Sequence, residues 1–83
     1  MFKNKFSGRN NICGEFIYAL RIAKGKDFSQ RKLADLIQLE GIDLDKNAIQ
    51  RIESGKRFVT DIELTAFAKI FGVTTDYLLK QQK

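Results

Sequence analysis

Five polar side chains between Lys46 and Ser54 are of the types that recognise the edges of DNA base pairs. Lysine and arginine donate to guanine O6 and N7, while asparagine and glutamine can pair bidentately with adenine. If this stretch is a helix, a step of about 100° per residue gathers the five within an arc of about 140°. The arc contains no acidic residue and consists of Lys46, Asn47, Gln50, Arg51 and Ser54.

The same face also has a plainer interpretation, because the solvated side of any surface helix is polar. The chain has 15 Lys and Arg against 10 Asp and Glu, a formal charge of +5, which permits an anionic partner without identifying it. Composition and periodicity alone therefore leave both interpretations open.

No other group of residues predicts catalysis or metal binding. The 83 residues include no histidine, the commonest general base, and only one cysteine, so no Cys/His nucleophile or metal site can be assembled. Cys13 is expected to be an inert, half-buried side chain. We therefore expect no enzymatic activity, metal ion, cofactor or small-molecule ligand.

Short helices must position the polar face, since no stretch alternates in the manner of a β-strand. Apolar residues recur at three- and four-residue spacings, and each pattern ends at a glycine or begins at a capping residue. The predicted helices lie within residues 12–25, 29–41, 45–55, 60–72 and 75–79. Their expected N-caps are Ser29, Asp45, Thr60 with Glu63 as its capping-box partner, and Thr74.

Each predicted helix has an apolar face that is expected to point toward one core. In the first helix this face consists of Ile12, Phe16, Ile17, Leu20 and Ala23. In the second it consists of Leu33, Ala34 and Ile37, and in the third of Ala48, Ile49 and Ile52. In the fourth it consists of Ile62, Leu64, Phe67, Ala68, Ile70 and Phe71.

The chain is expected to hold one folded domain, residues 11–80, because its length supports a single core. Residues 1–10, "MFKNKFSGRN", are polar and basic without periodicity, which predicts a flexible arm. Residues 81–83 form a short tail. The sequence has no signal-peptide pattern and no apolar run long enough to span a membrane, so a cytoplasmic protein is expected.

Several segments in this order and spacing resemble the helix-turn-helix regulators of the phage repressor and Cro type, also called XRE-like. The resemblance rests on "ALR" (19–21), "FSQRKLADLI" (28–37), "AIQRIESGKR" (48–57), "TDIELTAFAKIFGV" (60–73) and "TDYLL" (75–79). It implies an all-α, five-helix, lambda-repressor-like DNA-binding domain. The second and third helices would form the helix-turn-helix, with the third in the major groove.

The resemblance also assigns roles to individual residues. The positions that read base edges in the family are Lys46, Asn47, Gln50 and Arg51, and Ala48 beside them can meet a thymine methyl. The positions that contact the DNA backbone are Ser29, Gln30, Lys56 and Arg57. Arg21 and Glu53 match a family pair that forms a structural salt bridge.

The chain departs from the family pattern between Ile37 and Asp45, where it is longer than the usual short turn. The extra residues must extend the second helix, lengthen the turn, or both. We expect an apolar cover over this insertion, made of Leu36, Leu39, Ile42 and Leu44. Asp45 stands where Ser or Thr is common, and its charge would repel a nearby phosphate.

Together these features predict a sequence-specific transcriptional regulator, a repressor, that binds double-stranded DNA. One small domain makes few contacts, so a homodimer on a two-fold symmetric operator is expected, with half-sites about 34 Å apart. The family usually pairs through its last helices. The candidate contacts there are Val73, Tyr77, Leu78 and Leu79, all of which could instead belong to the core.

A function of another class stays open, because a fold does not fix a function. The chain could be a protein-interaction module of the same fold, such as an antitoxin-like or anti-repressor-binding protein. An exposed apolar patch on the last two helices, together with no affinity for duplex DNA, would favour this alternative.

Overall fold

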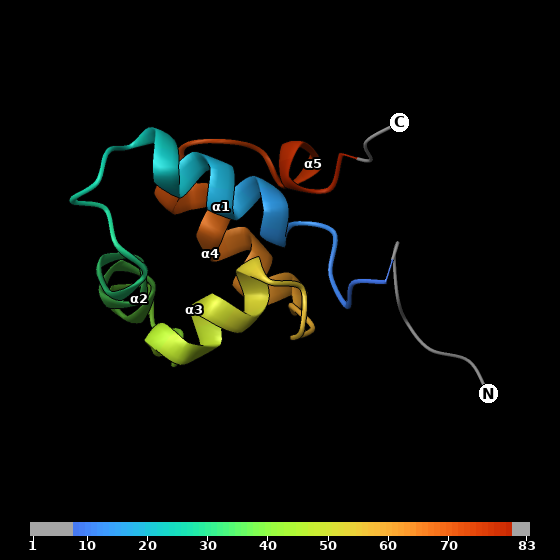
Figure 1. Cartoon of the computed structure of the whole chain (residues 1–83), viewed down its shortest axis with the longest axis horizontal. Helices are drawn as coiled ribbons and strands as arrows, with labels where there is room; N and C mark the ends of the chain where they lie inside the picture. The colour runs from blue at the N-terminus through green and yellow to red at the C-terminus, as the bar shows by residue number, and fades with distance from the viewer. Residues whose placement is uncertain (1–7, 81–83) are drawn as a thin grey trace.

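The computed structural model describes residues 8–80, which form five α-helices around one apolar core (Figure 1). The helices are α1 (Gly14–Ala23), α2 (Gln30–Leu39), α3 (Lys46–Glu53), α4 (Asp61–Phe71) and α5 (Thr75–Leu78). No strand occurs between residues 8 and 80, and the predicted all-α class is confirmed. Most of the predicted arm, residues 1–7, and the predicted tail, residues 81–83, lie outside the described residues.

The last four helices begin at the residues that the sequence predicts as N-caps. In each case the capping oxygen accepts a backbone N–H from the first turn, which otherwise lacks a partner. The caps are Ser29, Asp45, Thr60 and Thr74, and Thr60 and Glu63 form the predicted capping box. The first helix differs: α1 begins at Gly14, and its N-cap Cys13 makes no side-chain hydrogen bond.

The C-terminus of α3 is closed by Gly55, whose φ of 84° is a left-handed conformation. The Gly55 N–H donates to the Ile52 carbonyl at 3.1 Å, and the Lys56 N–H donates to the Arg51 carbonyl at 2.8 Å. This pair of bonds is a Schellman motif, which a glycine at this position allows without steric strain. The motif fixes where Lys56 leaves the helix.

Every helix contributes at least one fully buried side chain to the core. These side chains are Ile17, Leu33, Ile37, Ile49, Ile52, Phe67 and Leu78. Two residues expected on the inward faces are exposed, namely Ala23 of α1 and Ile62 of α4, of which Ile62 is 68% exposed. Ala23 lies about 120° around the helix from Ile17, and Ile62 lies about 140° from Phe67, so both are too far round to reach the core.

The connection between α2 and α3 is a lengthened turn, residues 40–44. It is fixed by the Gln38 side chain, whose Nε2 donates to the Leu44 carbonyl at 2.9 Å, and by the burial of Leu44 itself. Leu36 and Ile42 are half-buried, and Ile42 packs against the core. Leu39 does not belong to the expected apolar cover: it is 82% exposed because it lies about 200° around α2 from Ile37.

In Figure 1, α3 runs along the lower edge of the molecule beside α2, with α1 and α4 above it. The start of α1 and the start of α4 both approach the C-terminal end of α3. This convergence leaves the opposite side of α3 open to a partner.

Candidate nucleic-acid interface

The outward face of α3 is the centre of the candidate interface. All five polar side chains of the predicted arc are exposed: Lys46, Asn47, Gln50, Arg51 and Ser54. On the opposite side Ile49 and Ile52 are fully buried, and Ala48 is half-buried against the core. The predicted division of α3 into a polar and a core face is therefore present, while the pairing of each side chain with a base stays a prediction.

The N-terminus of α2 offers fewer free groups than the resemblance implied. Ser29 is exposed, and its Oγ accepts the Lys32 N–H at 3.0 Å. Gln30 is half-buried, and its Nε2 donates to Glu53 Oε1 at 3.0 Å, so part of its amide is already engaged inside the protein. The sequence-based predictions assign no role to Arg31 and Lys32, although both are exposed cations in the first turn.

A shallow groove runs between α2 and the start of α3. It is lined by residues of both charges, namely Arg31, Ala34, Asp35, Gln38, Asp45 and Lys46. Asp45 uses one carboxylate oxygen to accept the Ala48 N–H at 2.8 Å, which caps α3. The carboxylate adds negative charge at the edge of the candidate interface, as the sequence suggested.

Glu53 joins the three helices that carry the site. Arg21 Nε lies 2.7 Å from Glu53 Oε2, and Arg21 Nη2 donates to Oε1 at 3.0 Å, which makes a bidentate ion pair. The Glu53 side chain is only 4% exposed, and its hydrogen bond raises the pKa of Arg21 above the ordinary value. Since an unpaired buried charge is costly, this pair braces α3 against α1, and Gln30 adds α2.

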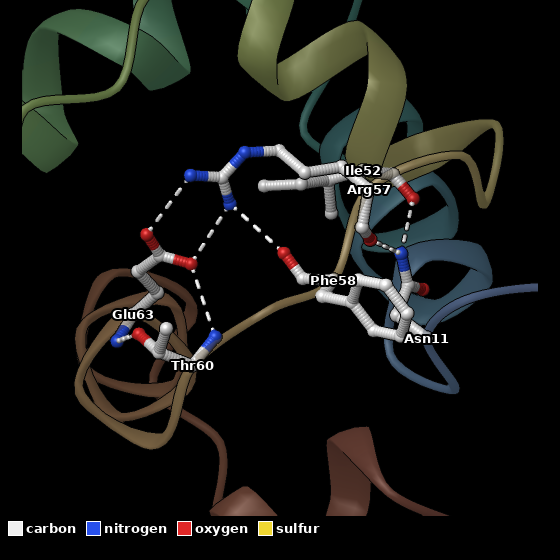
Figure 2. A network of polar contacts seen from close by, with 6 residues as sticks. All are labelled: Asn11, Ile52, Arg57, Phe58, Thr60 and Glu63. Atoms are coloured by element: carbon white, nitrogen blue, oxygen red, sulfur yellow. Dashed lines mark hydrogen bonds and ion pairs between the residues drawn. The ribbon is translucent and has the colours of Figure 1, made fainter. Parts of the chain in front are cut away.

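The two cations of the loop after α3, Lys56 and Arg57, differ in exposure. Lys56 is exposed, whereas Arg57 is half-buried and turns toward the start of α4. Figure 2 shows its guanidinium on the Glu63 carboxylate, with Nη1 at 2.9 Å and Nη2 at 3.2 Å. Burial alone would raise the pKa of Glu63, but the hydrogen bonds from Arg57 and Thr60 outweigh it and lower the pKa. Arg57 is thus engaged within the protein rather than free for a phosphate.

A second set of contacts, absent from the sequence-based predictions, holds the C-terminal end of α3. We call residues Arg9, Asn10 and Asn11 the N-terminal clasp. Arg9 Nη2 donates to the Glu53 carbonyl at 2.7 Å, and the Asn10 N–H donates to the Gly55 carbonyl at 2.8 Å. These carbonyls belong to the last turn and exit of a helix, where intrahelical partners are missing.

Asn11 is the most deeply buried member of the clasp. Its Nδ2 donates to the carbonyls of Ile52 at 3.0 Å and Arg57 at 2.8 Å, and its Oδ1 accepts the Gly14 N–H at 2.8 Å. Residues 9 and 10 are thus bound to α3 and its loop, contrary to the expectation of a free arm through residue 10. Partners more than forty residues away left no local signal in the sequence.

Cys13 is fully buried rather than half-buried as expected. Burial raises the pKa of its thiol to about 11, so the thiol stays protonated and unreactive. Across residues 8–80, the structure holds no group of three His, Cys, Asp or Glu residues arranged to hold a metal ion. The helices described there are also too short or too polar to cross a membrane.

The paired helices α2 and α3, with the polar face of α3 exposed, define a DNA-binding helix-turn-helix protein. A family model described as helix-turn-helix matches residues 17–78, which is well over half of the chain. The chain belongs to this family, of the phage repressor and Cro type, and is a DNA-binding regulator. Comparison of the chain with curated proteins and with solved structures returned no significant match.

Proposed function

We propose that the protein is a transcriptional repressor that recognises a specific operator with the exposed face of α3. One observation carries this proposal: the five side chains Lys46, Asn47, Gln50, Arg51 and Ser54 are all exposed, and none is acidic. Their donors and amide groups match the hydrogen-bonding pattern of the major groove. Ala48, half-buried between them, leaves room for the helix backbone to approach a thymine methyl.

The backbone contacts follow from exposure and charge. Lys56 and the N-terminus of α2 at Ser29 are exposed and lie at either end of the helix-turn-helix, where phosphates flank a bound helix. Gln30 and Arg57 are tied to Glu53 and Glu63. Gln30 still has a second amide hydrogen for a phosphate.

The test compares base reading with phosphate binding. A bound sequence is first selected from a random duplex pool, and the affinity for it is measured against single-base variants. Asn47→Ala and Arg51→Ala should each cost about 1 to 3 kcal/mol and relax preference at particular bases, whereas Lys56→Ala should weaken all sequences alike. Equal losses on every sequence from all three variants would exclude the base-reading assignment.

Operator binding by a homodimer is part of the proposal. Of the four candidate contacts, Leu78 is fully buried in the monomer and is withdrawn from the set, while Val73 is half-buried. Tyr77 of α5 and Leu79 just after it are 40% and 42% exposed and support a partner surface there. Repression itself is tested with a reporter gene whose promoter overlaps the selected operator, where expression should fall when the protein is supplied.

The second candidate function is a protein-interaction module, for example an antitoxin-like protein. It is favoured by apolar side chains exposed on α4 and α5, namely Ile62, Tyr77 and Leu79. Binding to random duplex DNA at low salt separates the two functions. A DNA-binding regulator shows a strongly salt-dependent affinity there, whereas a pure interaction module shows none.

A further inference from the structure

The loop that leaves α3 is held from two sides before any DNA arrives. On one side the clasp supplies donors: Asn10 Nδ2 bonds the Lys56 carbonyl at 3.0 Å, and Asn11 Nδ2 bonds the Arg57 carbonyl at 2.8 Å. On the other side the Arg57 side chain reaches the start of α4. Lys56 therefore projects from a backbone that is already fixed.

The Arg57 side chain makes two hydrogen bonds to α4 and a third within its own loop. Its guanidinium binds both oxygens of Glu63, and Nη1 also donates to the Phe58 carbonyl at 3.0 Å. Glu63 is held in turn, since Oε1 accepts the Thr60 N–H at 3.1 Å and the Glu63 N–H donates to Thr60 Oγ1 at 3.2 Å. Figure 2 shows this continuous path from Asn11 to the capping box of α4.

We propose that Arg57 is a positioning residue for DNA binding. By pairing with Glu63, Arg57 holds the loop in the conformation in which Lys56 meets a phosphate. This inference rests on the proposed function and concerns how the same site works. Arg57 and Glu63 together carry no net charge, and their side chains are only 30% and 12% exposed. Arg57 thus acts through the position of Lys56, because a loop ordered in advance loses less freedom on binding.

For the DNA affinity of Glu63→Gln, the proposal predicts a change opposite in sign to the one expected from net charge alone. Glu63→Gln raises the net charge of the protein by one, which on charge alone should strengthen DNA binding and steepen its salt dependence. If Arg57 positions Lys56, the same variant releases the loop, weakens binding and removes one phosphate contact. Glutamine keeps the capping-box acceptor for Thr60, so α4 retains its start.

The experiment measures the affinity of the full chain for duplex DNA across a salt series. We expect Glu63→Gln to bind about 3- to 10-fold more weakly, and its plot of log K against log salt to be flatter by about 0.9. Arg57→Lys should show a similar loss, although it keeps the charge, because an ammonium cannot replace the bidentate pair. Adding Lys56→Ala to Glu63→Gln should cost little more than Lys56→Ala alone.

Asp61→Asn is the matched control, since Asp61 is exposed in the same turn of α4 and lies outside the Arg57 pair. It removes one acid and should leave binding unchanged or slightly stronger. All measurements are made well below the melting temperature of the least stable variant, determined by circular dichroism. If Glu63→Gln melts too low for this, Arg57→Lys with and without Lys56→Ala decides the question.

Three results would overturn the inference: tighter binding by Glu63→Gln, full affinity in Arg57→Lys, or additive losses with Lys56→Ala. In each of these cases DNA binding by the wild type would stand. A wild type and an Asp61→Asn variant that both fail to bind duplex DNA at low salt would instead remove the proposed function, and the inference with it.

Discussion

Gly14 is a point of close contact between the start of α1 and the end of α3. A Cβ built there collides with the Ile52 carbonyl oxygen, which also accepts the Asn11 amide, so the surrounding groups cannot simply move aside. Glycine is a poor helix former, yet at this point it lets the start of α1 lie against the end of α3. The first residue of α1 is therefore limited to glycine by the Ile52 carbonyl of α3.

Gly14→Ala is expected to lower the free energy of unfolding by about 1 to 3 kcal/mol, the usual cost of forcing atoms into a packed site. Intrinsic helix propensity alone would stabilise the variant by about 1 kcal/mol. Urea denaturation followed by circular dichroism measures the difference. Ala23→Gly, at an exposed position of the same helix, supplies the propensity scale, and a stabilised Gly14→Ala would contradict the close approach.

Glu63 gives the stability of the protein a predictable dependence on pH. Its folded-state pKa lies below the ordinary value of 4.5, so the unfolded chain takes up the proton first as the pH falls. The contribution of Glu63 is therefore complete above about pH 5 and is lost as the pH drops through the lowered pKa. Urea unfolding from pH 7 to pH 3 should show the wild type approaching Glu63→Gln at the acid end. A constant difference over that range would exclude the ion pair as its source.

At the residue scale, the sequence predicts exposure well wherever the reason is local. The polar arc of α3 follows from the step of about 100° per residue. Asp45 and Thr60 mark helix starts because their side-chain oxygens can accept a backbone N–H of the first turn. The partner of Arg57 was not predictable in this way, because a cation in a basic loop reads as a phosphate contact until the start of α4 is placed beside it. A cationic side chain indicates an anionic partner, but not whether that partner is a phosphate or a carboxylate of the protein itself.

Among the elements, α3 depends most on what surrounds it. Its eight residues fall short of the roughly 12 to 15 that an isolated helix needs to be even marginally stable. Asp45 supports its first turn, the Arg21 and Glu53 pair holds its side, and the clasp occupies its last carbonyls. Recognition by α3 is therefore inseparable from these three supports.

Asn11→Ala tests the clasp at this scale. The variant leaves the Ile52 and Arg57 carbonyls and the Gly14 N–H without the side chain that satisfies them, which should cost about 1 to 3 kcal/mol. Hydrogen exchange should accelerate first at the C-terminal end of α3. Asn10→Ala, which removes only the exposed bond to Lys56, is the control and should cost less.

The helices and their caps could be predicted because each depends on a few neighbouring residues. The errors at Ala23 and Ile62 share one cause, since each apolar face was predicted to be wider than the arc that touches the core, whereas Leu39 was expected in the cover over the turn. The length of α2 and the course of the turn depend on Leu44 and Gln38 meeting, which periodicity does not reveal. The sequence therefore predicts the helices themselves but not how they pack against one another.

For the molecule as a whole, one exposed apolar surface lies at α5 and its C-cap Leu79. Leu79→Glu places a charge on that surface and should weaken self-association about tenfold or more, whereas Leu39→Glu, at a more exposed leucine of α2, should leave it unchanged. Sedimentation at tens of micromolar, with and without operator DNA, makes the comparison. A wild type that stays monomeric under both conditions would contradict the dimer.

The clasp also sets the order in which the molecule can be completed. Arg9 to Asn11 leave the ribosome more than forty residues before the carbonyls they bind, which at roughly 5 to 20 residues per second is a delay of about 2 to 9 s. During that interval the clasp has no binding partner, because the last turn of α3 has not yet been synthesised. The DNA-binding helix is thus completed by residues that were synthesised well before it.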